Sequence, residues 1–388
     1  MRLLSDDQTK AVEKLNRLKV GALFMGCGTG KTQTAISLVN SVTDCDLVLW
    51  VAPLRTIGNV KAEIEQCGSV YPVTFYGVES IGQSDRIFLE VLNLVKDKKS
   101  VFIVVDESLK IKNLRAKRTR RLIQIGNYCE YKLILNGTPV TKNILDIYPQ
   151  MLFLSPKILD KNFYKFRDDY CCYRQKKVNG RVVQTFITGY ANVEHLLSII
   201  EPYVYECSLD LPLSRQYRVK RWELTDTEAE EYYHLKMRLI DAISNDYRAG
   251  DVLGLFQKLQ HSYCLAENKI KALEGEIDDN TIIFCKFKLS VEELEKLYPN
   301  TKILTYGKNS FGLNLQRYSK IIYFDKTFDY AFREQSEARI YRTGQQNNCE
   351  YIDLTGNIGL EKLIDECISK KVGLVEAFKI KGLNLKEL

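Results

Sequence analysis

The sequence predicts an α/β fold in which two parallel sheets are each covered by helices on both faces. The first observation is a set of short, continuous apolar runs, such as 47–53 and 101–105, that alternate with segments of helical apolar spacing. The second observation is that this alternation starts afresh near residue 281. Strands that are apolar on both faces and separated by helices are typical of buried parallel sheets.

The composition is that of a globular chain long enough for two ordinary domains. Of the 388 residues, 45% are hydrophobic and 27% are charged, and no apolar run approaches the length that crosses a bilayer. The N-terminus has no signal-peptide core, so we expect a cytoplasmic protein. A net charge of +7 favours a polyanionic partner. The eleven cysteines form no C-x-x-C pair and only three histidines are present, so we expect reduced thiols and neither a zinc site nor a disulfide framework.

A glycine-rich turn follows the first predicted strand, 20–25, and precedes a helix. Its sequence, GCGTGKT over 26–32, is typical of a phosphate-binding loop, because glycines let backbone N–H groups face the phosphates and the helix N-terminus adds partial positive charge. Lys31 is expected to reach the β- and γ-phosphates, and Thr32 to offer a hydroxyl to Mg²⁺. The strict pattern has glycine where this chain has Met25, and a turn that merely redirects the chain is the alternative. The expected cofactor-binding residues in this turn are Gly28, Thr29, Gly30, Lys31 and Thr32.

The segment upstream of this turn, 3–12, predicts a helix start capped by Ser5 or Asp6. Within it, Gln8 carries an amide that both donates and accepts hydrogen bonds, as the edge of an adenine base requires. Two interpretations of Gln8 stay open here, a contact with the base and an ordinary place on the helix surface.

A later apolar run, 101–105, delivers two carboxylates to the end of a predicted strand. Asp106 is suited to hold Mg²⁺, directly or through water, and Glu107 to orient and deprotonate the attacking water. An acidic turn without a catalytic role is the alternative. The next strand, 131–135, is followed by Thr138, whose small hydroxyl is suited to sense the nucleotide and couple it to movement.

The segment 110–121 carries seven basic residues in twelve. Such a run is usually a solvated helix face, but this one follows the acidic pair directly. Contact with a phosphate backbone is therefore an equal alternative.

Three of these motifs together resemble the first motor lobe of Swi/Snf-type ATPases in helicase superfamily two. They are GTGKT at 28–32, DESLKIKN at 106–113 and LNGTP at 135–139, and the KIKN tail is the sharpest marker of that branch. Leu109 stands where relatives usually carry histidine. The resemblance covers most of the chain and implies two RecA-like lobes that bind ATP and Mg²⁺ between them and act on nucleic acid.

Between the lobes, the stretch 173–186 predicts a β-hairpin, since Asn179 and Gly180 form the favoured two-residue turn. Basic residues that include Lys176 and Lys177 flank this turn. A prong that contacts DNA and a small surface hairpin are both consistent with the pattern.

The second half resembles a connector followed by a shortened second lobe, since relatives usually carry a longer segment between their first strand and the next motif. A strand at 217–224 and a long helical stretch to about residue 248 come first. Strands are then predicted at 281–287, 302–306 and 320–324, with helices at 290–298 and about 332–342. We divide the chain into a first RecA-like lobe, 1–160, an insertion with the hairpin, 161–200, and the connector with the second lobe, 201–388. The chain thus resembles a minimal motor of this family, for which we expect a bacterial or bacteriophage origin and a place in the cytoplasm of a prokaryotic or phage-infected cell.

On the last predicted helix, Gln335, Arg339 and Arg342 are spaced by four and three residues and so share one face. Two arginines on one face are suited to present a guanidinium to the γ-phosphate of ATP held on the other lobe, whereas surface salt bridges are the alternative. Gly344 and Gln345 complete the family's Q-x-x-x-R-x-x-R-x-G-Q signature.

These features favour an ATP-driven motor that moves along double-stranded DNA in replication, recombination or repair, acting as a monomer with ATP and Mg²⁺. The expected catalytic residues are Lys31, Asp106, Glu107, Arg339 and Arg342, Gln335 is expected to contact the nucleotide, and Thr32 and Asp106 to hold the metal. The expected nucleic-acid contacts are Arg55, Thr56, Lys110, Lys112, Asn113, Lys176, Lys177, Lys286, Asn309, Ser310 and Asn314.

Other functions share parts of this pattern. A strand-separating or fork-remodelling, annealing helicase uses the same motor, with the hairpin as a wedge. An ATP-regulated DNA-binding scaffold that does not hydrolyse ATP comes from another class, although the intact Glu107 and both arginines argue against it. A small-molecule kinase leaves the second lobe unexplained.

Overall fold

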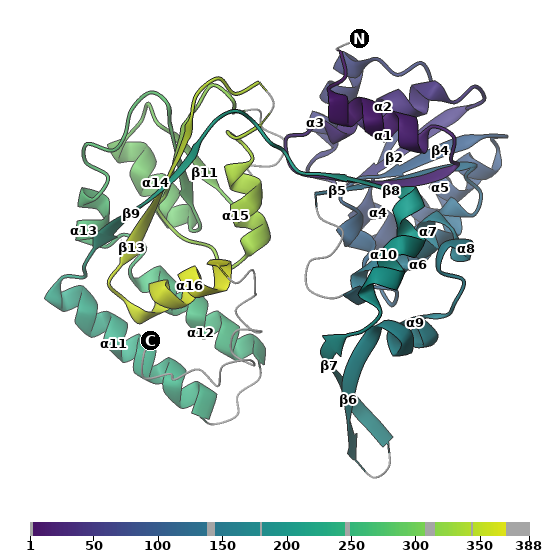
Figure 1. Ribbon diagram of the computed structural model, residues 1–388. Coiled ribbons are helices and arrows are strands. Elements are labelled where there is room, and N and C mark those ends of the chain that lie inside the picture. The colour runs from purple at the N-terminus through teal and green to yellow at the C-terminus, as the bar shows by residue number, and fades with distance from the viewer. Residues whose placement is uncertain are drawn as a thin grey trace. The chain divides into compact units, whose positions relative to one another are not determined.

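The computed structural model describes residues 3–137, 144–178, 181–244, 249–306, 315–342 and 344–369. The chain divides into two compact units, Met1–Leu209 and Asp210–Leu388 (Figure 1). Each unit contains one all-parallel sheet packed against helices, so the predicted α/β fold class is confirmed.

The sheet of the first unit has six strands in the order β3-β2-β4-β5-β1-β8. Every neighbouring pair in it is parallel. The strands are β1 (Val20–Met25), β2 (Leu47–Ala52), β3 (Val73–Gly77), β4 (Val101–Val105), β5 (Tyr131–Asn136) and β8 (Val204–Cys207).

Helices cover both faces of this sheet because successive strand residues point to opposite faces. In β1, Leu23 packs with α1 (Asp6–Leu15), α2 (Lys31–Ser41) and α3 (Ile57–Cys67), whereas Phe24 packs with the other helix layer. That layer contains α4 (Val78–Gln83), α5 (Asp85–Lys96), α6 (Lys117–Gly126), α7 (Ile147–Leu154), α8 (Pro156–Leu159), α9 (Phe163–Tyr170) and α10 (Val193–Ile200). Short 3₁₀ turns lie at η1 (Ser108–Ile111), η2 (Ile144–Asp146) and η3 (Glu201–Tyr203).

Two segments of the first unit differ from the sequence predictions. The sequence LRTIGN over 54–59, after the apolar run 47–53, predicts a loop, but this segment enters α3 at Ile57. Strand β8 pairs with β1, so residues 201–209 belong to the first unit, whereas the connector was expected to begin at residue 201.

The predicted hairpin is present as the antiparallel pair β6 (Cys171–Val178) and β7 (Arg181–Tyr190). Its pairing is interrupted by register shifts at Cys172/Tyr173 and Lys176/Lys177. Figure 1 shows that the hairpin extends from α9 and α10, away from the six-stranded sheet of its unit. The turn residues Asn179 and Gly180 lie outside the described residues.

The sheet of the second unit has five parallel strands in the order β11-β10-β12-β13-β9. They are β9 (Arg215–Trp222), β10 (Thr281–Cys285), β11 (Lys302–Thr305), β12 (Lys320–Tyr323) and β13 (Cys349–Gly356). One apolar core joins this sheet to α11 (Asp226–Ser244), α12 (Ala249–Ser262), α14 (Lys288–Leu297) and α16 (Gly359–Ser369), beside the short α13 (Glu267–Lys271). On the other face, α15 (Tyr330–Glu337) contacts β12, where the Tyr323 hydroxyl lies 3.0 Å from Ser336 Oγ.

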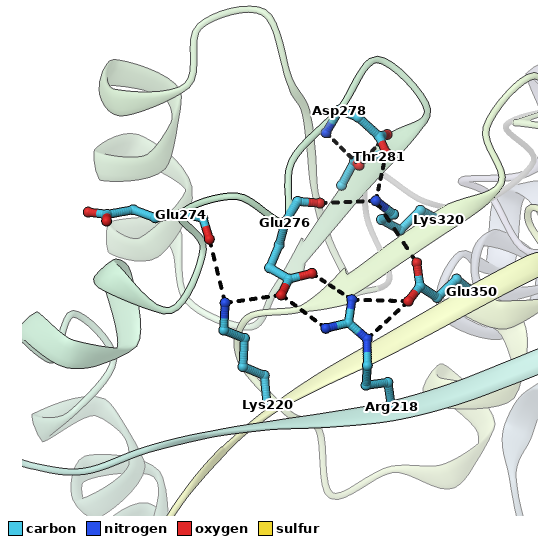
Figure 2. Close-up of polar contacts among 8 residues, drawn as sticks. All are labelled: Arg218, Lys220, Glu274, Glu276, Asp278, Thr281, Lys320 and Glu350. Carbon is cyan, nitrogen blue, oxygen red and sulfur yellow. Dashed lines mark hydrogen bonds and ion pairs between the residues drawn. The ribbon is translucent and has the colours of Figure 1, made fainter.

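A cluster of charged side chains ties the edge strand β9 to the rest of the second unit (Figure 2). Arg218 donates two hydrogen bonds to Glu276, of 3.0 and 2.6 Å, and a third of 3.1 Å to Glu350 on β13. Lys220 lies 3.0 Å from the same Glu276 carboxylate, and Lys320 at the start of β12 lies 2.6 Å from Asp278. These groups connect β9 to β13 and to the segment before β10, so we assign them to stability.

Replacing Glu276 by Gln is expected to destabilise the second unit in a pH-dependent way. The hydrogen bonds from Arg218 lower the pKa of Glu276 to about 2, from an ordinary value of 4.5. A lowered pKa stabilises the folded state above the unfolded pKa, and this stabilisation disappears as the pH falls through the folded pKa. Urea unfolding should therefore show a loss of about 1–2 kcal/mol at pH 7 that shrinks as the pH falls from 4.5 toward 2.

Glu274→Gln is the matched control, because Glu274 contributes only its backbone carbonyl to the cluster and its side chain points away (Figure 2). An equal loss in both variants, or a loss that does not change with pH, would contradict the assignment.

Among the described residues, no helix is both long and apolar enough to cross a membrane. All eleven cysteines are free thiols.

Candidate active site

The predicted phosphate-binding loop connects β1 to α2. Gly30 has φ +80°, a backbone conformation that favours glycine, and a Cβ built on it would lie 2.2 Å from the side-chain nitrogen of Gln8. Helix α2 starts at Lys31 with no side-chain cap and no acidic residue in its first turn. The start of α2 thus carries no side chain that competes with an anion as its cap, which suits phosphate binding at a helix N-terminus.

Lys31 reaches back across this loop. Its ammonium donates to the carbonyl oxygens of Met25 at 2.9 Å and Gly26 at 3.1 Å. Because these carbonyls are exchangeable acceptors, phosphate oxygens can replace them without burying an unpaired charge.

Gln8 holds the loop against α1. Its side-chain nitrogen donates to the Thr29 carbonyl at 2.9 Å, and its oxygen accepts from the Ser5 backbone at 3.0 Å in a capping box. Gln8 is buried, so it is not an ordinary surface residue of the helix. The contact with adenine stays a prediction.

The acidic pair lies at the carboxyl end of β4, at the same edge of the sheet as the loop after β1. Glu107 has φ +53°, which is rare for a residue with a side chain, and its N–H donates to Asp106 Oδ1 at 2.9 Å. Burial and the neighbouring Glu107 charge raise the pKa of Asp106 to about 7, while Lys31 opposes that rise. Lys31 and Asp106 are thus close enough to interact electrostatically, as one phosphate site requires.

The donors at this edge fit a magnesium ion that takes most of its ligands from elsewhere. Asp106 and Thr32 offer a carboxylate and a hydroxyl, both hard oxygen ligands. The described residues contain no group of three or more His, Cys, Asp or Glu side chains that could hold a metal. Mg²⁺ ordinarily takes only one or two carboxylates and completes its shell with phosphates and water, so the donor set fits.

Several side chains of the basic segment 110–121 form ion pairs inside the first unit. Lys110 lies 3.7 Å from Glu79, Lys112 lies 3.5 Å from Asp146, and Lys117 and Arg121 both pair with Asp85. Arg118 donates to the Lys110 carbonyl at 2.6 Å. Four of the seven basic side chains therefore form ion pairs, with three carboxylates between them, while Arg115 and Arg120 are exposed.

Glu79 also joins the turn after β4 to the segment after β2. Its carboxylate accepts the Leu54 N–H at 3.0 Å as well as pairing with Lys110. Arg55 is exposed beside this contact, whereas Thr56 is buried and donates to the Pro53 carbonyl at 2.9 Å. Of the residues predicted to contact nucleic acid here, Arg55 and the two lysines therefore present charge at one edge.

Other predicted contacts are placed differently. The Asn113 side chain accepts the Arg115 N–H at 2.9 Å within its own turn. Lys176 and Lys177 lie on β6, and of their side chains nothing is described. Thr138, Asn309, Ser310 and Asn314 lie outside the described residues.

Lys286, at the end of β10, is engaged inside the second unit. Its ammonium hydrogen-bonds to Gln260 and lies 4.7 Å from the Phe328 ring centre. Burial lowers the pKa of Lys286 to about 8. Its backbone N–H donates to Asp325 at 3.1 Å.

The predicted helix over 332–342 is wrong in its second half. Helix α15 ends at Glu337, so Gln335 is helical, but Arg339 and Arg342 follow in turns. In these turns the Arg339 N–H donates to the Ser336 carbonyl at 3.1 Å, a backbone hydrogen bond over three residues in place of the four of an α-helix. Gln345 closes the turns, because its side chain donates to the Ile340 carbonyl at 3.1 Å. The two arginines therefore do not share a helix face with Gln335.

Two buried polar contacts, one in each unit, were missed in the sequence. Ser108 and Gln150 form a fully buried hydrogen bond of 2.6 Å behind the acidic pair. Lys269 and Asp325 form a buried ion pair of 2.6 Å below the end of β12. The one sequence feature that could have indicated the first of these contacts is the glutamine, Gln150, inside the apolar stretch 147–154.

A phosphate-binding loop and an acidic pair at one edge of a parallel sheet, with a second parallel-sheet unit behind them in sequence, define a RecA-like ATPase of two units. The model of the SNF2-related domain matches residues 12–264, which is more than half of the chain. The chain therefore belongs to the SNF2-related domain family, and its resemblance to Swi/Snf-type ATPases of helicase superfamily two is confirmed.

Individual relatives match shorter stretches. Helicase SWR1 of Mycosarcoma maydis is 26% identical over 215 residues, which are 47% of this chain and 12% of that protein. Transcription regulatory protein SNF2 of Saccharomyces cerevisiae is 25% identical over 182 residues, 40% of this chain and 11% of that protein. The alignments thus span about a tenth of the length of these relatives. Among solved structures, a Sulfolobus solfataricus SWI2/SNF2 ATPase core in complex with dsDNA matches with TM-score 0.46 and 18% identity, covering 100% of this chain and 97% of that one.

Proposed function

We propose that the protein hydrolyses ATP and uses the energy to move along double-stranded DNA. The observation that carries the proposal is that the loop with Lys31, after β1, and the Asp106–Glu107 pair, after β4, lie at the same carboxyl edge of one parallel sheet. Family membership and the names of relatives such as helicase SWR1 support it.

The chain's own groups account for nucleotide binding and for activation of water. The N–H groups at the start of α2 receive the phosphates, and Lys31 exchanges its two carbonyl acceptors for phosphate oxygens. When bound, Mg²⁺ neutralises charge on the phosphates, with Asp106 and Thr32 as its protein ligands. Glu107 orients the attacking water and accepts its proton. The nucleotide-site roles of Gln335, Arg339 and Arg342 stay predictions.

The nucleic acid is proposed to bind beside this edge, at the segments that follow β2 and β4. Arg55, Lys110 and Lys112 present cations there, and Glu79 holds the two segments together. Contacts of this kind are made to phosphates, so binding is expected to be independent of sequence and to weaken with salt.

A second function is favoured by one observation, the hairpin β6–β7 that extends from its unit. A two-stranded projection is suited to part the strands of a duplex or to remodel a fork. Deletion of residues 175–182 separates the two functions, since loss of unwinding with intact ATP hydrolysis would favour the wedge.

The proposed motor function includes three further proposals. They are a role in replication, recombination or repair, a cytoplasmic location and a monomeric state.

Steady-state ATP hydrolysis tests the proposal. The purified protein is assayed alone and with duplex DNA, single-stranded DNA, forked DNA and RNA at one fixed salt concentration. We expect the strongest stimulation with duplex DNA. Stimulation by forks or single strands alone would favour the remodelling enzyme, and no hydrolysis with any of them would overturn the motor in favour of a binding scaffold.

A further inference from the structure

A buried hydrogen bond lies directly behind the acidic pair. Ser108 Oγ donates to Gln150 Oε1 at 2.6 Å, and both residues have no exposed surface. Gln150 comes from α7, whose neighbouring residues Met151, Phe153 and Leu154 are buried apolar side chains. A buried amide in such surroundings is unfavourable unless its polar atoms are paired, so Ser108 and Gln150 depend on each other.

Gln150 also connects Ser108 to Asp146 and, through Asp146, to Lys112. Its side-chain nitrogen donates to the Asp146 carbonyl at 2.8 Å, and the Asp146 carboxylate lies 3.5 Å from the Lys112 ammonium. The Lys112 side chain is 39% exposed, whereas that of Asp146 is 14% exposed. One chain of polar contacts therefore joins the residue after Glu107 to a cation at the surface.

The backbone at the catalytic end of this chain needs external support. Glu107 has a left-handed conformation at φ +53°, which a residue with a side chain keeps only where its surroundings impose it. The next residue, Ser108, is the one that Gln150 holds. A shift of Gln150 thus acts on the direction in which the Glu107 carboxylate points.

We propose that Gln150 is a positioning residue that couples nucleic-acid binding at Lys112 to the orientation of Glu107. This inference rests on the proposed function. A phosphate of the nucleic acid competes with Asp146 for the Lys112 ammonium, because both groups are anions and the Lys112 side chain is 39% exposed. The segment 144–150 then adjusts, and the Gln150–Ser108 bond passes the change to the acidic pair. We call this series of contacts from Lys112 through Asp146 and Gln150 to Ser108 the relay. The partner that acts on it is a nucleic-acid phosphate backbone.

The first test compares Gln150→Leu with the wild type and with Leu152→Met, a volume-conserving control on the same helix. We expect Q150L to lower the ratio of duplex-stimulated to unstimulated ATP hydrolysis by about fivefold, the size of one hydrogen bond's net contribution. The KM for ATP and the duplex Kd should stay within about twofold of wild type, since Gln150 touches neither ligand. Leu152→Met should leave the ratio unchanged.

The double variant Ser108→Ala/Gln150→Leu separates coupling from simple structural support. Both substitutions remove the same bond, so the double variant should be no worse than the worse single variant. Additive losses, or a lower unfolding temperature with an unchanged stimulation ratio, would overturn the relay.

A second measurement does not depend on hydrolysis. Amide hydrogen exchange of residues 106–112 is followed with and without duplex DNA. The wild type should change its protection on binding, and Q150L should bind the duplex without that change. If the wild type binds but hydrolyses nothing, the proposed motor fails while this readout still decides the relay; if stimulation is normal and Q150L behaves as wild type, the relay alone fails.

Discussion

Replacing Glu107 by Gln is expected to lower kcat for ATP hydrolysis by about 10²–10⁴-fold, which is the usual contribution of a general base. Gln has nearly the same shape, and the contact with Asp106 comes from the backbone N–H of residue 107, so the turn should remain folded. Nucleotide affinity should be kept, because the N–H groups of α2 and the Lys31 ammonium are unchanged.

Glu65→Gln is the control, since it removes the same charge from the exposed surface of α3. Single-turnover hydrolysis and nucleotide binding are measured on both variants. An E107Q protein that hydrolyses ATP at the wild-type rate would remove Glu107 from the role of general base.

Replacing Lys269 by Met is expected to destabilise the second unit by about 3–5 kcal/mol, because it leaves one member of a buried ion pair without its partner. Lys269 and Asp325 are each 2% exposed, and their charged atoms lie 2.6 Å apart. The Lys269 ammonium also donates to the Cys264 carbonyl at 3.2 Å and lies 4.3 Å from the Phe324 ring centre. Urea unfolding, followed by a probe in the second unit, measures the loss.

The double variant Lys269→Met/Asp325→Asn should recover part of this stability. It removes the unpaired charge, and the amide oxygen can still accept the backbone N–H groups of Lys286 and Phe287. Lys271→Met is the control on the same helix, because its ion pair with Glu267 is exposed and should contribute about 0–1 kcal/mol. A K269M protein as stable as the K271M protein would refute the role of the buried pair.

Local chemistry made much of the first unit predictable. Glycines, a lysine and a threonine between an apolar run and a helix are typical of a phosphate-binding loop, and β1 and α2 flank them as expected. The run 101–105 is buried on both faces as β4, with the acidic pair at its carboxyl end. These features depend on neighbours in sequence, and so sequence spacing is sufficient to find them.

The second half shows where local spacing fails. Ala338 and Arg339 are good helix formers, yet α15 stops at Glu337 because the chain turns to bring Gln345 back to Ile340. Helix propensity is a weak preference that such tertiary contacts readily override.

The sequence by itself determined the alternation of strands and helices in each half, the phosphate-binding loop and the position of the acidic pair, since each depends on short-range patterns of apolar, glycine and charged residues. Only the tertiary structure decided which charges are neutralised and which polar groups are buried. Gln150 meets Ser108 across 42 residues, and Lys269 meets Asp325 across 56. Coulomb and hydrogen-bond energies depend on distance in space and on loss of water, and both are set only when the helices pack on the sheets.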